Sequence, residues 1–257
     1  VVTETFDFDA SKKATDYLRT LDLSTATGSV TFKNADKSVS YERKYIVSNP
    51  DNVGVYMFTA NKPGKQSLRI NLVSGKPGVD ATSKYEEGEA YFSGKLETVS
   101  YNARIKVVNK GGTLRTRITS IEVLNADTVL IYMAAGTDYD IYSNSYTNAT
   151  LRSNLASTMQ ERITKAAQKS WEQIYEDHVA DHQQYFNRVD FQIDAAKNNQ
   201  PTNQLVDNYT TYKGTTNAGA LMLEKLYFDY GRYLTIAGSR GIDLPTNLQG
   251  IWNNNTT

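Results

Sequence analysis

The chain of 257 residues contains no cysteine, which excludes disulfide bonds, thiolate metal ligands and a cysteine nucleophile. It also has no apolar run that approaches the roughly 20 residues of a membrane helix, and no signal peptide opens it at Val1. A signal upstream of Val1 would be consistent with both observations. Basic and acidic residues number 28 each, so neither charge is in excess. This balance disfavours nucleic acid and anionic membranes as partners and favours a neutral one.

Residues 1–148 contain short segments of strand character separated by turn residues. The clearest strands are residues 38–47 and 53–60, which are separated by Asn49-Pro50-Asp51-Asn52. Gly111-Gly112 predicts a hairpin turn between two further strands. Regular strands with few helix signals predict an antiparallel β-sandwich, incomplete at its start. The other candidate strands are residues 29–32, 67–72, 90–93, 103–108, 113–123 and 128–134.

The pattern becomes helical in residues 149–194, which we interpret as a linker. Between Thr150 and Tyr185, apolar residues recur every three or four positions and predict one or two amphipathic helices whose stripe packs on a domain. Residues 186–194 then predict an extended return strand. The stripe comprises Leu151, Leu155, Met159, Ile163, Ala166, Ala167, Trp171, Ile174 and Tyr175.

The remaining residues, 195–257, are expected to begin a helical domain. Residues 195–215 are polar and interrupted by proline, and predict a loop. Residues 218–236 predict a helix that is apolar nearly all round and is therefore buried among other helices.

The last residues place a cluster of amides and an indole after this helix. Gln249, Trp252 and Asn253 are its main members. Amides donate and accept hydrogen bonds as sugar hydroxyls do, and a tryptophan face can stack on a pyranose ring. The segment therefore suits a neutral, hydroxyl-rich ligand, although asparagine-rich segments are more often solvated turns.

Three stretches near the C-terminus resemble the entry to the catalytic domain of glycoside hydrolase family 95, the α-L-fucosidase family, which also includes α-L-galactosidases. They are residues 230–234 (Tyr-Gly-Arg-Tyr-Leu), 238–241 (Gly-Ser-Arg-Gly) and 244–253. Residues 15–23, 41–43, 48–51 and 134–139 are similar to the N-terminal β-domain of the same family. The resemblance implies a β-sandwich of the super-sandwich type, a helical linker and the first helices of an (α/α)6 barrel.

The resemblance also implies an activity. Family members are inverting glycosidases with a glutamate acid and an Asn-x-Asn pair that, with an aspartate, activates water. Asn253 and Asn255 have this spacing, but the family pair lies in a later motif, so no catalytic residue is expected before Thr257. We expect Gln249, Trp252 and Asn253 to border the substrate pocket. The alternative is that these side chains only stabilise the end of the preceding helix. The chain alone should be inactive.

The implied parent enzyme needs no cofactor or metal. It would release terminal α-L-fucose, or the similar L-galactose, from glycans in the periplasm or outside a bacterium. Two alternatives stay open: the β-sandwich could be a carbohydrate-binding or purely structural module, or the chain could come from a different (α/α)6 glycosidase or phosphorylase.

Three polar clusters have competing interpretations. His178 and His182 have the spacing of a zinc helix but lack the following glutamate, so packing is favoured over metal binding. Asp138 and Asp140, with Tyr139 and Tyr142, could line a sugar site, but turn formation is favoured. The acidic residues Glu86, Glu87 and Glu89, with Lys84, predict a solvated loop.

Overall fold

The computed structural model describes residues 1–6, 13–73, 82–193, 200–214 and 216–241. The chain divides into two compact units. The first comprises Val1–Leu21 and Thr27–His178, and the second comprises Asp22–Ala26 and Val179–Thr257. Each unit is described by itself below.

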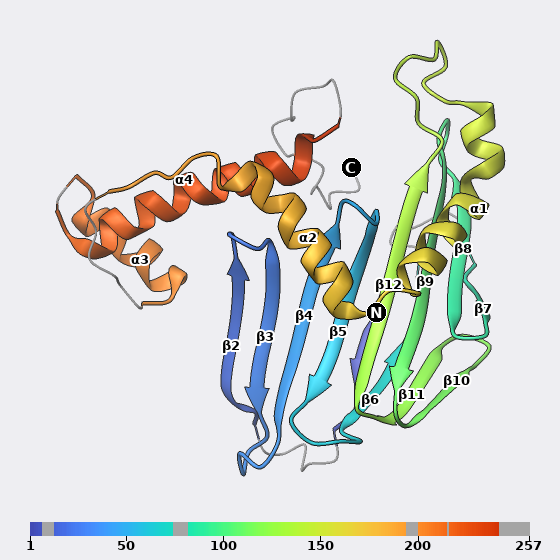
Figure 1. The fold of residues 1–257 in the computed structure, drawn as a ribbon, viewed down its shortest axis with the longest axis horizontal. Helices are drawn as coiled ribbons and strands as arrows, with labels where there is room; N and C mark the ends of the chain where they lie inside the picture. Colours follow the sequence, from blue (N-terminus) through green and yellow to red (C-terminus); the bar gives the residue numbers. More distant parts are fainter. Residues whose placement is uncertain (7–12, 74–81, 194–199, 215, 242–257) are drawn as a thin grey trace. The chain divides into compact units, whose positions relative to one another are not determined.

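Two antiparallel sheets form the first unit and confirm the predicted sandwich (Figure 1). The larger sheet has the strand order β2-β3-β4-β5-β12-β9-β8-β7, and the smaller one β1-β6-β11-β10. The larger sheet consists of β2 (Thr15–Asp22), β3 (Thr27–Lys33), β4 (Ser40–Ser48), β5 (Val53–Ala60), β7 (Lys84–Glu86), β8 (Glu89–Lys95), β9 (Ser100–Lys110) and β12 (Thr128–Thr137). The smaller consists of β1 (Val2–Glu4), β6 (Gln66–Ile70), β10 (Thr113–Thr116) and β11 (Ile121–Ala126).

The main core lies between the two sheets. Because strand side chains alternate between faces, strands β5, β6, β8, β9, β11 and β12 contribute residues from one face to it. Val129 and Ile131 of β12 meet Leu68 and Ile70 of β6 there, and all four are at least 96% buried. Burial of this apolar surface holds the sheets together.

Strand β12 is buried on both faces, which explains its uninterrupted apolar run. Its alternate residues, Tyr132 and Ala134, pack under the first helix, α1 (Ala149–Ala166), against Met159 and Ile163. Figure 1 shows α1 running along the outer face of the larger sheet. A continuous apolar strand is typical of a sheet that is covered on both sides.

The predicted linker is a pair of helices joined by a short turn. The second helix, α2, extends over Trp171–Phe186. Ser170 and Gln173 form a capping box, in which each side chain accepts a hydrogen bond from the other residue's backbone N–H. Lys169 holds the turn to the sandwich through Asp51, at 2.6 Å.

Gly111-Gly112 is not a hairpin turn, contrary to the prediction. It connects β9 of the larger sheet to β10 of the smaller one, so the chain changes sheets there. Both glycines have left-handed φ angles, 70° and 65°, which glycine adopts without steric cost. The single strand predicted over residues 113–123 is likewise two strands, β10 and β11.

Helices α3 (Thr202–Tyr212) and α4 (Ala218–Ser239) belong to the second unit. α3 replaces most of the loop predicted over 195–215, because Leu205 packs on one face of a helical turn and is 4% exposed. The predicted return strand is also wrong over the described residues 187–193, which pair with no strand. α4 forms as predicted, but among its described residues only Ala220 and Gly238 are buried.

Candidate functional site

Helix α4 precedes the residues that were predicted to border a sugar site. Asn217 caps its first turn by accepting hydrogen bonds from the backbone N–H groups of Gly219 and Ala220, at 2.9 and 3.3 Å. The helix ends at Ser239, and Gly241 follows in the left-handed region with φ 68°. The predicted substrate residues Gln249, Trp252 and Asn253 fall in 242–257, outside the described residues, and stay predictions.

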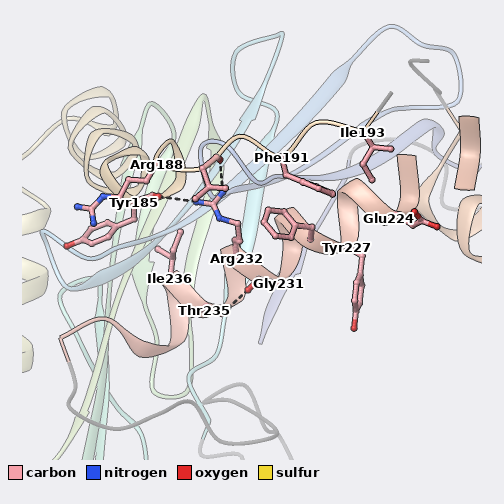
Figure 2. Close-up of a pocket in the computed structure, with 12 residues that line it drawn as sticks. Tyr185, Arg188, Phe191, Ile193, Glu224, Tyr227, Gly231, Arg232, Thr235 and Ile236 are labelled. Atoms are coloured by element: carbon pink, nitrogen blue, oxygen red, sulfur yellow. Dashed lines mark hydrogen bonds between the residues drawn. The ribbon is translucent and has the colours of Figure 1, made fainter. Parts of the chain in front are cut away.

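A groove of about 850 Å³ runs along α4 within the second unit (Figure 2). Its other wall is the extended segment that follows α2. Phe191 of that segment packs on Phe228 of α4, with ring centroids 4.7 Å apart. The side chains of Val189 and Ile193 also line the groove. The alternating apolar residues that predicted a strand therefore cover one side of a helix.

Arg232 of α4 binds the end of α2 and the extended segment that follows it. Its guanidinium donates to the carbonyl oxygens of Tyr185, Phe186 and Val189, at 3.1, 2.8 and 3.2 Å. α2 ends at Phe186, and the last carbonyls of a helix have no intrahelical partner. Arg232 satisfies them and is thereby committed to structure. The resemblance included this residue in its motif but did not indicate its role.

Glu224 is the one carboxylate among the described residues that line the groove. It accepts a hydrogen bond from the Tyr209 hydroxyl of α3 at 3.0 Å, and this bond raises the pKa of Tyr209. Inverting hydrolysis needs two carboxyl-type groups, or an equivalent water activator, on opposite faces of the sugar. The described part of the groove does not supply that pair, and its apolar lining suits packing better than sugar hydrolysis.

The two histidines are packing residues in the described structure, as the sequence favoured. His178 and His182 are 4% and 5% exposed. Nε2 of His182 donates to the Leu23 carbonyl at 2.8 Å, and its ring stacks on Phe186 with centroids 5.2 Å apart. Burial lowers the pKa of His182 more than this hydrogen bond raises it. The described residues bring together no group of three His, Cys, Asp or Glu side chains that would hold a metal ion.

Asp138 is fully buried and joins the end of β12 to α1. Its carboxylate accepts from the backbone N–H of Ser100 at 2.7 Å and from Nε of Arg152 at 2.6 Å. Although burial opposes it, this bonding holds the pKa of Asp138 below its ordinary value. Asp140 accepts from Asn148 at 3.0 Å. Both aspartates therefore build the turn, which was the favoured interpretation.

Glu89 does not lie in a solvated loop, contrary to the prediction. Residues 84–86 and 89–95 are the strands β7 and β8, and Glu87 and Gly88 form the turn between them. Glu89 accepts from Arg104 at 3.0 Å, from Lys106 at 2.8 Å and from Gln160 at 3.2 Å. Sequence reasoning missed this cluster because its members lie far apart along the chain.

Two family models match the chain. The family model described as "Glycosyl hydrolase family 65, N-terminal domain" matches residues 2–142, which are the sandwich. The model described as "Glycosyl hydrolase family 95 catalytic domain" matches residues 170–257, which begin at α2.

Two curated relatives match nearly the whole chain. "Probable alpha-fucosidase A" of Aspergillus niger is 32% identical over 252 residues, covering 92% of this chain and 30% of that protein. "Alpha-L-fucosidase 2" of Arabidopsis thaliana is 26% identical over 281 residues, covering 96% of this chain and 32% of that protein. The chain thus spans about a third of the length of these relatives.

A solved structure shares the fold. "Putative kojibiose phosphorylase from human microbiome" superposes with a TM-score of 0.55 and 13% sequence identity, over 72% of this chain and 27% of that one. At this identity the similarity shows the fold alone.

Proposed function

Because this chain belongs to glycoside hydrolase family 95, with a first domain of the type described for the N-terminus of family 65, we propose that it is part of an exo-glycosidase that releases terminal α-L-fucosyl residues from glycans. The observation that carries the proposal is the order of the two matches. The sandwich comes first and the catalytic model begins at α2, and relatives named as α-fucosidases align across both parts.

The catalytic groups are proposed to lie in the part of the relatives that this chain does not span. Among the described residues, Asp138, Glu89 and Glu224 all have structural partners. In the proposed inverting reaction, an acid protonates the leaving oxygen while amide groups deliver water to the opposite face of the sugar. Helices α3 and α4 would begin the (α/α)6 barrel, and the amide and indole groups that follow α4 would border its pocket.

Hydrolysis of 4-nitrophenyl α-L-fucopyranoside tests this proposal directly. A protein that continues beyond Thr257 should release nitrophenol, and proton NMR should show β-L-fucose as the first product. The 257-residue chain alone should show no turnover. Turnover by the 257-residue chain would refute our placement of the catalytic groups, and α-L-fucose as first product would refute inversion.

The role of the C-terminal amides is tested in the longer protein. Trp252→Ala and Gln249→Ala should raise KM about tenfold or more if these side chains contact sugar, since each removes one stacking or hydrogen-bonding partner. Asn254→Ala serves as the neighbouring control and should leave KM unchanged. Equal kinetics for all three variants would assign Gln249 and Trp252 a bracing role instead.

Substrate choice between L-fucose and L-galactose depends on the hydroxyl at C6 of the latter. A site with a buried polar group for that hydroxyl would reject fucose strongly, because the group would be left unpaired. Comparing kcat/KM for the two nitrophenyl glycosides decides the question, and we propose that fucose is preferred.

A phosphorylase is the second candidate, because the sandwich matches the family 65 model over residues 2–142. Such an enzyme would transfer the sugar to inorganic phosphate instead of water. Adding phosphate to the assay discriminates the two: a phosphorylase makes a sugar 1-phosphate and stops without phosphate, whereas a hydrolase is indifferent to it.

The proposed setting is a bacterial periplasm or exterior, where complex glycans are degraded. No helix in the described part of the chain is long and apolar enough to span a membrane. The relatives named above come from a fungus and a plant, so the family itself is not confined to bacteria.

A further inference from the structure

The loop between β12 and α1 presents two tyrosine rings to solvent. Tyr139 and Tyr146 are 47% and 59% exposed, although they lie in the first unit beside a well-packed sandwich. Their rings are parallel within 6° and their centroids are 6.5 Å apart. This separation is near the upper end of the range for aromatic pairs, so each ring covers little of the other's face. The pair is an exposed aromatic platform.

Backbone hydrogen bonds fix the loop that carries the two rings. The backbone N–H of Asp140 donates to the carbonyl of Tyr146 at 3.0 Å, and Tyr139 pairs with Thr147 as an isolated β-bridge. The backbone N–H of Asn148 donates to the carbonyl of the buried Asp138 at 2.9 Å. Rigid aromatic side chains lose little conformational entropy when a ligand stacks on them.

The backbone at Tyr146 is strained. Its φ angle is 54°, in the left-handed region that bulky side chains seldom adopt and that costs about 1–2 kcal/mol outside glycine. Glycine would fit this position without that cost. A tyrosine there adds nothing to the buried core, because its ring is exposed. Strain that persists at an exposed aromatic residue indicates a functional reason for the ring.

Polar groups of the right kind lie next to the rings. The hydroxyls of Ser143, Ser145 and Thr147 form an exposed chain in which neighbouring oxygens are 3.1 Å apart. Hydroxyls both donate and accept hydrogen bonds, as sugar hydroxyls do. Flat apolar faces beside such groups match a pyranose ring, which has an apolar face and a polar rim.

We propose that Tyr139 and Tyr146 form a binding surface for a neutral oligosaccharide on the sandwich. The carboxylate of Asp138 accepts from Ser100 of β9 and Arg152 of α1, and that of Asp140 accepts from Tyr142 and Asn148 of the loop, so neither acid is left unpaired for a cationic ligand. The choice of ligand class rests on the proposed function. The surface would hold a glycan chain near the enzyme and would take no part in cleavage.

Titration of the ¹⁵N-labelled 257-residue chain with 2′-fucosyllactose tests the inference. Amide shifts that saturate and cluster at residues 139–147 are expected. Tyr139→Ala and Tyr146→Gly should each weaken binding roughly tenfold, as expected for loss of one stacking face. Tyr146→Phe keeps the ring and should bind as the native chain does. Tyr17→Ala, which removes a tyrosine that is 62% exposed elsewhere on the same unit, is the matched control and should also bind normally.

Tyr146→Gly separates folding from binding. Glycine relieves the left-handed strain, so the variant should melt no lower than the native chain while binding is lost. Native affinity in this variant, or shifts that cluster outside residues 139–147, would overturn the inference. Absence of any shift would overturn it as well.

The result can be distinguished from that of the proposed function. Hydrolysis of nitrophenyl fucoside involves a small substrate that does not need the platform. Hydrolysis of the fucoside by the longer protein, with no binding of oligosaccharide to the loop, would refute this inference alone. Loop binding together with no hydrolysis by the protein that continues beyond Thr257 would remove the proposed function and leave a carbohydrate-binding surface.

Discussion

Replacing Glu89 with glutamine should destabilise the first unit by about 2–3 kcal/mol. The carboxylate joins three elements: it accepts from Arg104 and Lys106 of β9 and from Gln160 of α1, while Glu89 itself begins β8. The variant keeps the shape of the side chain but removes its charge. Two cations would then remain beside a neutral amide.

The magnitude follows from burial. Removing one partner of a fully buried ion pair costs about 3–5 kcal/mol, whereas exposed pairs contribute about 0–1 kcal/mol. The side chains of Glu89 and Arg104 are 14% and 12% exposed, and that of Lys106 is 30% exposed. Because the cluster is mostly buried and glutamine retains one acceptor oxygen, the expected loss lies below the buried limit. It corresponds to a Tm decrease of roughly 5–10 °C for a unit of this size.

The effect should depend on pH. Burial raises the pKa of Glu89, but its hydrogen bonds and the Lys106 charge outweigh burial and hold the pKa below its ordinary value of 4.5. A carboxyl whose pKa is depressed by folding stabilises the protein above the unfolded pKa and loses that contribution as the pH falls through the folded value. The stability difference between native chain and variant should therefore be complete at neutral pH and shrink below about pH 4.5.

Urea unfolding followed by circular dichroism, at several pH values, measures this difference. Glu122→Gln is the matched control, because Glu122 also has two cationic partners, Arg69 and Arg117, but these are 61% and 51% exposed. Its effect should be clearly smaller. A loss at Glu89 no larger than at Glu122, or one that grows toward low pH, would show that the cluster does not stabilise the fold as argued.

Three further predictions concern other contacts. Gly112→Ala should destabilise the first unit by more than about 2 kcal/mol in urea unfolding, because residue 112 has φ 65° and its Cβ would lie 2.2 Å from the Leu124 carbonyl oxygen. Gly64→Ala should cost less, because residue 64 has a similar φ of 68° but its Cβ would make only ordinary contacts. Arg232→Lys should speed hydrogen exchange in the last turn of α2, since one ammonium cannot replace a guanidinium that bonds three carbonyls. Arg188→Lys is the control: it loses only one hydrogen bond to a carbonyl and should change exchange less. The melting temperature of the second unit should fall as the pH drops below 6.5, because folding lowers the pKa of His182 and the unfolded state therefore takes up the proton first. The variant His182→Phe should lose this pH dependence of the melting temperature.

Local patterns in the sequence predicted the elements whose partners lie close along the chain. The strand over residues 53–60 has the predicted bounds, and the helical stripe of residues 155–166 lies against the sheet. In both cases, burial on one face imposes a period that a single segment can display. A strand was also predicted over residues 128–134, and β12 extends over Thr128–Thr137.

The errors arose where the partner is distant. The strand-like alternation of Val189, Phe191 and Ile193 is real, but these side chains line a groove against α4 instead of entering a sheet. A turn at Gly111-Gly112 was correctly located, yet a hairpin and a crossing between sheets use the same left-handed glycines. Which strand a segment joins is decided by long-range pairing that its own residues do not encode.

The polar clusters of the described residues have their hydrogen-bonding positions occupied by partners within the protein. A catalytic group needs an unsatisfied hydrogen-bonding position that a substrate can reach, and a pKa near the working pH. Asp138 and Glu89 have pKa values below their ordinary range because cations and N–H donors already occupy their oxygens. The positive charge of Arg232 is used by three carbonyls. In these clusters, the charged groups that could transfer a proton are therefore already bonded to partners within the protein.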